Sequence, residues 1–103
     1  MSNIKDVETW LKDEFGVRLW PNPMRAIAMA GEDIIKSWTI VKRGSKGIQA
    51  KFLQAVLICM GYPCSLDGVF ASDSVDALKK YQKDNGFIVS GIAGKAIIRR
   101  IFM

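Results

Sequence analysis

The chain has 103 residues, of which 50% are hydrophobic, with 15 Lys and Arg against 10 Asp and Glu, a net charge of +5 and no histidine. This length suits one compact domain, and no apolar run is long enough to span a bilayer. Without histidine the chain cannot form a Ser-His-Asp triad, a Cys-His pair or a histidine-bound zinc centre. We therefore expect no catalytic residue, no metal and no cofactor.

The N-terminal part of the chain predicts short helices. Apolar residues recur with helical spacing over residues 4–15, and Gly16 follows, so we expect an amphipathic helix that ends there. Residues 17–23 contain two prolines and predict a turn or an extended link. Residues 23–38 predict either one helix kinked at Gly31 or two short helices separated by it.

The remainder of the chain predicts three more helices. Their expected ranges are 46–60, 73–84 and 95–102. Ser45 and Ser72 are expected to cap the first two of these helices, and Gly61 to close the first in a left-handed conformation. Residues 87–89 predict a brief extended segment. The expected core contains Leu53, Leu57, Val75, Leu78 and Ile98.

Two segments of the chain share one pattern. Residues 67–78 and 90–101 each run from a polar residue through glycine and a branched aliphatic residue into a turn and a helix. Gly68 corresponds to Gly91 in this comparison. Two copies are too few for a solenoid, so the pattern predicts one small helical domain with an internal pseudo-repeat.

The charge is unevenly distributed along the chain. Residues 1–38 carry a net charge of −1, whereas residues 39–103 carry a net charge of +6. A basic surface favours anionic partners such as nucleic acid, membrane headgroups or cell-wall polymers. The same charge can also serve only to keep a solvated face soluble, and both interpretations remain open at this point.

The two cysteines do not form a recognised motif. Cys59 and Cys64 are too far apart for a Cys-x-x-Cys redox or zinc motif. A free thiol packed as a small hydrophobic side chain and a disulfide across the turn are both compatible with this spacing. Neither cysteine is a candidate nucleophile, because the chain offers no histidine to activate it.

A series of short motifs in the C-terminal part follows the order and spacing of a known family. These motifs are Arg43-Gly44-Ser45-Lys46-Gly47, Leu53-Gln54, Gly61-Tyr62, Asp67-Gly68, Tyr81-Gln82 and Gly86-Phe87. With them, residues 40–101 resemble the peptidoglycan-binding domain found beside many bacterial and phage cell-wall hydrolases. The chain departs from the family pattern at Ala71, where the family has Gly, at Ser90, where it has Asp, and at Ile97, where it has Thr.

The resemblance implies an all-α fold, with a small three-helix domain at residues 39–103 and a helical extension at residues 1–38. It implies non-catalytic binding of peptidoglycan that targets an attached or partner hydrolase, as in a phage endolysin or an autolysin. The extension is then a candidate contact for the hydrolase, and no membrane partner is expected. The first twenty residues lack the apolar core of a signal peptide, so we expect a soluble protein that is cytoplasmic until its release and then acts at the cell wall.

A groove for such a polymer needs aromatic or apolar walls and a few polar groups. The candidate ligand-binding residues, at the turns where such side chains leave the helices, are Tyr62, Asp67, Gly68, Phe70, Ser72 and Phe87. Each has a structural alternative, because the phenylalanines can fill the core and Tyr62 can pack back over its helix. Gln54 and Gln82 are expected to brace loop backbone through their amide groups.

Two other function classes stay open. A small basic helical protein can bind nucleic acid, although no recognition helix stands out here. A glycan hydrolase needs a pair of facing carboxylates, whereas the acidic pairs at residues 13–14 and 32–33 are adjacent in sequence. The three tryptophans, Trp10, Trp20 and Trp38, are expected to fasten the N-terminal helices onto the domain, with an exposed interface as the alternative.

Overall fold

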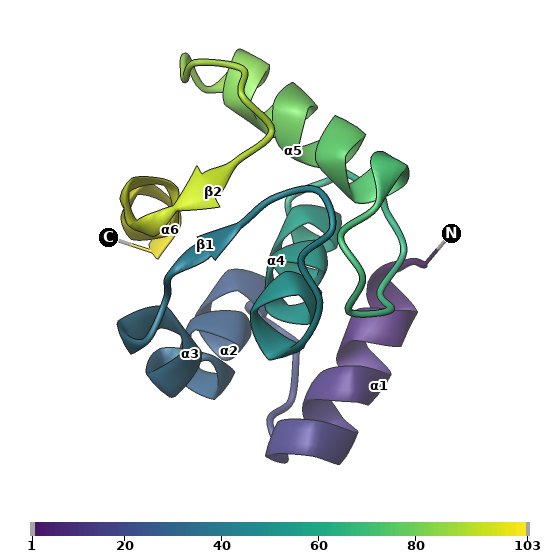
Figure 1. The fold of residues 1–103 in the computed structure, drawn as a ribbon. Helices are drawn as coiled ribbons and strands as arrows, with labels where there is room; N and C mark the ends of the chain where they lie inside the picture. The colour runs from purple at the N-terminus through teal and green to yellow at the C-terminus, as the bar shows by residue number, and fades with distance from the viewer. Residues whose placement is uncertain (1, 103) are drawn as a thin grey trace.

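The computed structural model describes residues 2–102, which form a mostly helical fold with one small two-stranded sheet (Figure 1). The elements are α1 (Ile4–Phe15), α2 (Pro23–Ala30), α3 (Glu32–Lys36), β1 (Ile40–Val41), α4 (Ile48–Cys59), α5 (Ser72–Asp84), β2 (Ala93–Gly94) and α6 (Lys95–Phe102). The predicted all-α class is therefore confirmed. Within this range no helix combines the length and the apolar character needed to cross a membrane.

Helix α4 is the centre of the molecule. It packs against α1, α2, α3 and α5, and Figure 1 shows it in the middle of the fold. Its residues from Phe52 to Ile58 are all buried, because an apolar helix surrounded by neighbours has no face left for water. The five predicted core residues are buried, with exposed fractions of 4% or less.

The N-terminal helices share this core. Asn3 caps α1 and forms a capping box with Asp6, and Gly16 ends the helix with a φ of 65°, as predicted. Val7 and Leu11 of α1 are fully buried and belong to the same hydrophobic cluster as Ile98 of α6. The division of the chain into two units at residue 38 stays a prediction.

Gly31 separates two short helices rather than kinking one. A Cβ atom at this position would lie 2.0 Å from the Cε1 atom of Phe52, so the close approach of the α2–α3 junction to α4 requires glycine. Trp38, just after α3, is also buried, and its indole N–H donates a hydrogen bond to the Ala93 carbonyl at 3.0 Å. Trp38 thus fastens the N-terminal helices as expected, whereas Trp20 is 53% exposed and does not.

The small sheet was not among the predicted elements. Strand β1 pairs antiparallel with β2, with Ile40 opposite Gly94 and Val41 opposite Ala93. Two residues per strand are too few to show an alternating pattern in the sequence. The predicted extended segment at residues 87–89 contains no strand, and the pairing occurs at β2 instead.

Both predicted serine caps were wrong. Helix α4 begins at Ile48 after Gly47, and the Ser45 hydroxyl instead accepts a hydrogen bond from the Lys42 N–H at 3.0 Å. Helix α5 begins with Ser72 as its first helical residue, and it has no side-chain cap. The predicted helix end at Gly61 is confirmed, with a φ of 93°.

Candidate binding site

Gln54 of α4 organises the turn at residues 67–69. Its side chain is fully buried, and its Oε1 atom accepts hydrogen bonds from the N–H groups of Asp67 (3.2 Å) and Gly68 (2.9 Å). Its Nε2 atom donates to the Val69 carbonyl at 2.9 Å and to the Ser74 hydroxyl at 2.8 Å. The amide therefore satisfies the buried Gly68 N–H and the buried Ser74 hydroxyl, and it also holds the more exposed backbone of Asp67 and Val69. The prediction that Gln54 braces loop backbone is confirmed.

Gln82 of α5 makes the corresponding bonds to the turn at residues 90–92. Its Oε1 atom accepts from the N–H groups of Ser90 (3.1 Å) and Gly91 (2.9 Å), and its Nε2 atom donates to the Ile92 carbonyl at 3.1 Å. The Ser90 hydroxyl accepts a hydrogen bond from the Ile92 N–H at 3.2 Å. Asp67 makes the equivalent bond to the Val69 N–H in the other turn. In each turn, therefore, a side-chain oxygen accepts a hydrogen bond from the N–H group two residues later, and Ser90 provides in the second turn what Asp67 provides in the first.

Tyr62 packs against the C-terminal turns of α5. Its ring meets Tyr81 edge-on with 5.8 Å between centroids, and its hydroxyl donates a hydrogen bond to the Asp84 carboxylate at 2.8 Å. This bond raises the pKa of Tyr62. A hollow of about 380 Å³ opens between Tyr62 and α5, and Asp76 and Lys80 also line it. We call it the Tyr62 hollow.

Asp73 forms part of the same hollow and is held by the preceding loop. Its Oδ2 atom accepts a hydrogen bond from the Ser65 N–H at 2.7 Å. Hydrogen bonding from Ser65 lowers the pKa of Asp73, because it stabilises the charged carboxylate. The Tyr62 hollow therefore combines an aromatic wall with carboxylates and one ammonium group.

Asp67 and Gly68 line a different hollow, of about 290 Å³, whose other walls come from α1 and α4. Trp10 and Lys51 face each other there, with the Lys51 ammonium 5.4 Å from the centre of the indole ring. Gly68 itself is buried with a φ of 77°, so it shapes the turn. Sequence reasoning missed the contribution of Trp10 and Lys51, because only the fold places α1 beside this turn.

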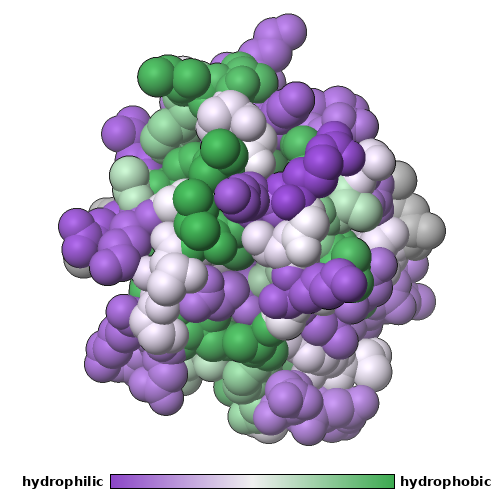
Figure 2. All heavy atoms as spheres, in the orientation of Figure 1, coloured by the Kyte–Doolittle hydropathy of each residue, from purple (hydrophilic) through white to green (hydrophobic). Residues whose placement is uncertain are grey.

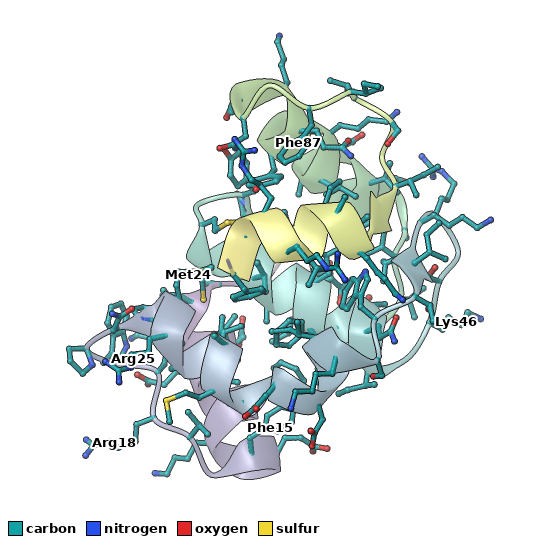
Figure 3. The ribbon with its side chains drawn as sticks, turned by 90° about the vertical axis from the view of Figure 1, so that its left-hand side faces the viewer. Phe15, Arg18, Met24, Arg25, Lys46 and Phe87 are labelled. Atoms are coloured by element: carbon teal, nitrogen blue, oxygen red, sulfur yellow. The ribbon has the colours of Figure 1, made fainter. Side chains whose placement is uncertain are left out.

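The other three predicted site residues lie apart from these hollows. Phe70 is fully buried in the core, which corrects its assignment as a ligand-contacting side chain. Ser72 is exposed at the start of α5. Phe87 stacks on Tyr81 at 5.9 Å, with the Arg100 guanidinium 5.8 Å from its ring. Figure 3 shows Phe87 at the end of the molecule opposite Phe15.

Hydrophobic side chains also reach the surface near the sheet. Figure 2 shows them gathered over β1 and β2 and around the loop that follows α5. The large exposed apolar residues of these segments are Ile40, Ile88, Val89 and Ile92. This face offers apolar contact area, and the hollows offer polar groups.

The structure gives no support for chemistry at the cysteines. Both are free thiols, and burial raises the pKa of Cys59 to about 11 and that of Cys64 to about 12. The neutral thiol is therefore the stable form of each at neutral pH. Among residues 2–102 no cluster of acidic or cysteine side chains is arranged to hold a metal ion.

A small helical domain with open hollows lined by aromatic and charged side chains has the architecture of a ligand-binding module. Residues 46–101 match a family described as a putative peptidoglycan binding domain. Because the match covers more than half of the chain, the chain belongs to the peptidoglycan-binding domain family. The match confirms the resemblance predicted from the sequence motifs.

Individual relatives agree with this assignment. Over 61 residues the chain is 41% identical to the N-acetylmuramoyl-L-alanine amidase CwlL of Bacillus licheniformis, covering 56% of this chain and 17% of the amidase. The N-terminal domain of SleB superposes with a TM-score of 0.60 at 32% identity, covering 63% of this chain and 90% of that domain.

A third relative is a peptidoglycan-binding protein from Clostridioides difficile, solved in complex with glutamine hydroxamate. It gives a TM-score of 0.59 at 28% identity, covering 61% of this chain and 40% of that protein. The chain thus spans less than half the length of this protein and about a sixth of the amidase.

Proposed function

We propose that this chain binds bacterial peptidoglycan without cleaving it and brings an attached or partner hydrolase to the cell wall. The observation that carries the proposal is the family match over residues 46–101. The amidase CwlL, in which the similar region is a small part of the whole, supports the pairing of such a domain with a hydrolase. Tethering would raise the local concentration of substrate around the catalytic domain of the hydrolase. The hydrolase could be a bacterial autolysin or a phage endolysin.

We place the main contact at the Tyr62 hollow. Peptidoglycan carries flat sugar rings, amide groups, carboxylates and ammonium groups. The partly exposed ring of Tyr62 can stack against an apolar face, while Asp76 and Lys80 can pair with charged groups of opposite sign. The Asp84 hydrogen bond holds the Tyr62 ring in place, so little side-chain entropy is lost on binding.

The Asp67 turn provides a second contact in this proposal. Because Gln54 and Gln82 brace their turns with matching hydrogen bonds, we infer that one turn-and-helix unit is used twice in the domain. The first of these turns borders a hollow shared with α1, at Trp10. The N-terminal extension then assists binding at this point, and part of its remaining surface is a candidate contact for a hydrolase.

Replacing Tyr62 by Ala together with Asp67 by Asn should weaken binding to purified peptidoglycan sacculi. The first change removes the aromatic wall, and the second removes a charge while keeping the Oδ1 acceptor that the turn needs. Co-sedimentation with sacculi measures the effect, and circular dichroism checks that the helices are intact. The single variant Tyr62→Phe is the matched control, because it keeps the ring and loses only the hydrogen bond to Asp84, so its binding should lie between that of the parent and that of the double variant. A folded double variant that sediments fully with sacculi would place the site elsewhere.

The chain alone should release neither reducing ends nor free amines from sacculi. It has no histidine. Its acidic pairs at residues 13–14 and 32–33 lie on separate helices, α1 and α3. On α3, Glu32 forms an ion pair with Lys36 at 3.2 Å. Chemical assays for the two products, run with protein purified free of lysins, check this expectation. Turnover that persists through purification would contradict the assignment as a binding module.

A further inference from the structure

Trp20 stands in the loop between α1 and α2 as an exposed aromatic wall. Its side chain is 53% exposed, and it borders two hollows, of about 440 Å³ and 350 Å³. Arg18 and Leu19 also line both hollows. Because Leu19 is 1% exposed, the loop is anchored in the core and holds Trp20 in a defined position.

The surroundings of Trp20 are rich in positive charge. Lys12 lines the larger hollow, where Glu8 is the acidic neighbour, and Arg25 lines the smaller one. The described residues that border the smaller hollow include no Asp or Glu. Within residues 2–102 the ion pair present joins Glu32 and Lys36, so neither arginine has a carboxylate partner there.

The two arginines are presented on the same edge of the molecule. Figure 3 shows Arg18 and Arg25 projecting outward at the left-hand edge of the view, both below Phe87. Asn22 caps α2 by accepting a hydrogen bond from the Arg25 N–H at 3.2 Å, which fixes the backbone from which Arg25 projects. An aromatic wall with unpaired guanidinium groups beside it suits a ligand with both an apolar face and an anionic group.

We propose that Lys12, Arg18, Trp20 and Arg25 form a second binding surface, which takes an anionic glycan chain. A sugar ring stacks on the Trp20 indole, and the arginines hold carboxylate or phosphate groups of the same chain in bidentate pairs. A chain polymer fits better than a single small molecule, because two hollows share the Trp20 indole as a wall. The choice of a wall polymer rests on the proposed function, and two sites on one polymer would add avidity.

The test compares two charge variants that change the net charge equally. Arg18→Gln with Arg25→Gln removes the two guanidinium groups, and Lys42→Gln with Arg43→Gln removes two exposed charges in another loop. We expect the apparent Kd for sacculi to rise roughly tenfold in the first variant and much less in the second. Trp20→Ala should weaken binding as well. Equal losses in the two charge variants would overturn the proposal, because they would show a general charge effect.

The source of the anion is resolved by two preparations of sacculi. One retains its covalently attached phosphate polymers, and the other is stripped of them with hydrofluoric acid. An arginine effect confined to the unstripped wall identifies phosphate, and an effect on both identifies the carboxylates of peptidoglycan. Either result supports the surface. If the Arg18 and Arg25 double variant and Trp20→Ala both bind the two preparations with the Kd of the parent, the glycan-binding surface is overturned. A contact with a protein would then be favoured.

A direct readout separates this surface from the Tyr62 hollow. Each tryptophan gives one indole N–H signal in a ¹⁵N NMR spectrum, and Trp20→Phe assigns that of Trp20. Titration with soluble fragments from enzymatically digested, unstripped wall should shift the Trp20 signal but not that of Trp38, which is bonded internally. The shift should persist in the Tyr62 and Asp67 double variant. If the parent protein fails to sediment with sacculi, the proposed function is wrong. If the Trp20 signal does not move in the NMR titration, the second binding surface is wrong, whatever the result of sedimentation.

Discussion

Replacing Phe52 by Ala should lower the free energy of unfolding by about 3–5 kcal/mol, because it removes a fully buried ring from the centre of the molecule. The ring packs against Trp38, with 6.3 Å between centroids, and against Phe102, at 5.8 Å. It also fills the space beneath Gly31, where even a Cβ atom would not fit. A cavity at this position cannot close easily, since three separate elements would have to move together.

Urea unfolding followed by circular dichroism measures this loss, with Phe15→Ala as the matched control. Phe15 is only partly buried at the end of α1, so the same chemical change should cost clearly less there. Equal costs for the two variants would contradict the central role of Phe52.

The same experiment bears on the division at residue 38. Phe52 belongs to the family-matched region, whereas Gly31 and Trp38 precede it. Because the two regions share one core, tryptophan fluorescence and circular dichroism should report a single unfolding transition in the parent and in the variant. Two separate transitions would favour an independent extension over residues 1–38.

The helices were predictable because their apolar residues recur at helical spacing and their ends carry glycine. Gly16 and Gly61 show positive φ where the sequence indicated helix ends. The Ser45 cap failed for a local reason, since the Ser45 hydroxyl already accepts a hydrogen bond from the Lys42 N–H in the loop before α4. A hydroxyl near a helix start therefore indicates a cap only when no nearer backbone group competes for it.

The candidate site could be anticipated from the sequence only where it depends on nearby positions in the chain. The loop at residues 63–71 joins Tyr62 to α5, and Tyr62 and Asp73 line one hollow. The pairing of Trp10 with the Asp67 turn depends on how α1 packs against α4, which sequence spacing does not encode. Phe70 belongs to a turn but points into the core, because a small domain needs aromatic volume wherever its loops cross the interior.

Replacing Gln54 by Leu should destabilise the domain by roughly 3 kcal/mol or more, although the two side chains have similar volumes. Leucine would leave the N–H groups of Asp67 and Gly68, the Val69 carbonyl and the Ser74 hydroxyl without the partner that Gln54 supplies. Each buried polar group that loses its partner costs about 1–3 kcal/mol, unless the loop opens to water. We expect the loop to open, so hydrogen exchange of the Gly68 amide should accelerate together with the loss of stability.

Gln82→Leu is the internal control for this prediction. Gln82 makes the matching bonds to the second turn, but the hydroxyl that it bonds belongs to the exposed Ser90, whereas Gln54 bonds the hydroxyl of the fully buried Ser74. Water can therefore replace part of what is lost at Gln82. Its cost should therefore be smaller, and faster exchange should appear at Gly91 rather than at Gly68. If Gln54→Leu leaves Gly68 protected, the turn is held by its own backbone and Gln54 is dispensable. If Gly68 is exposed and sacculus binding falls as well, the folded shape of the Asp67 turn is itself a requirement for binding, since Gln54 is fully buried and has no surface to offer a ligand.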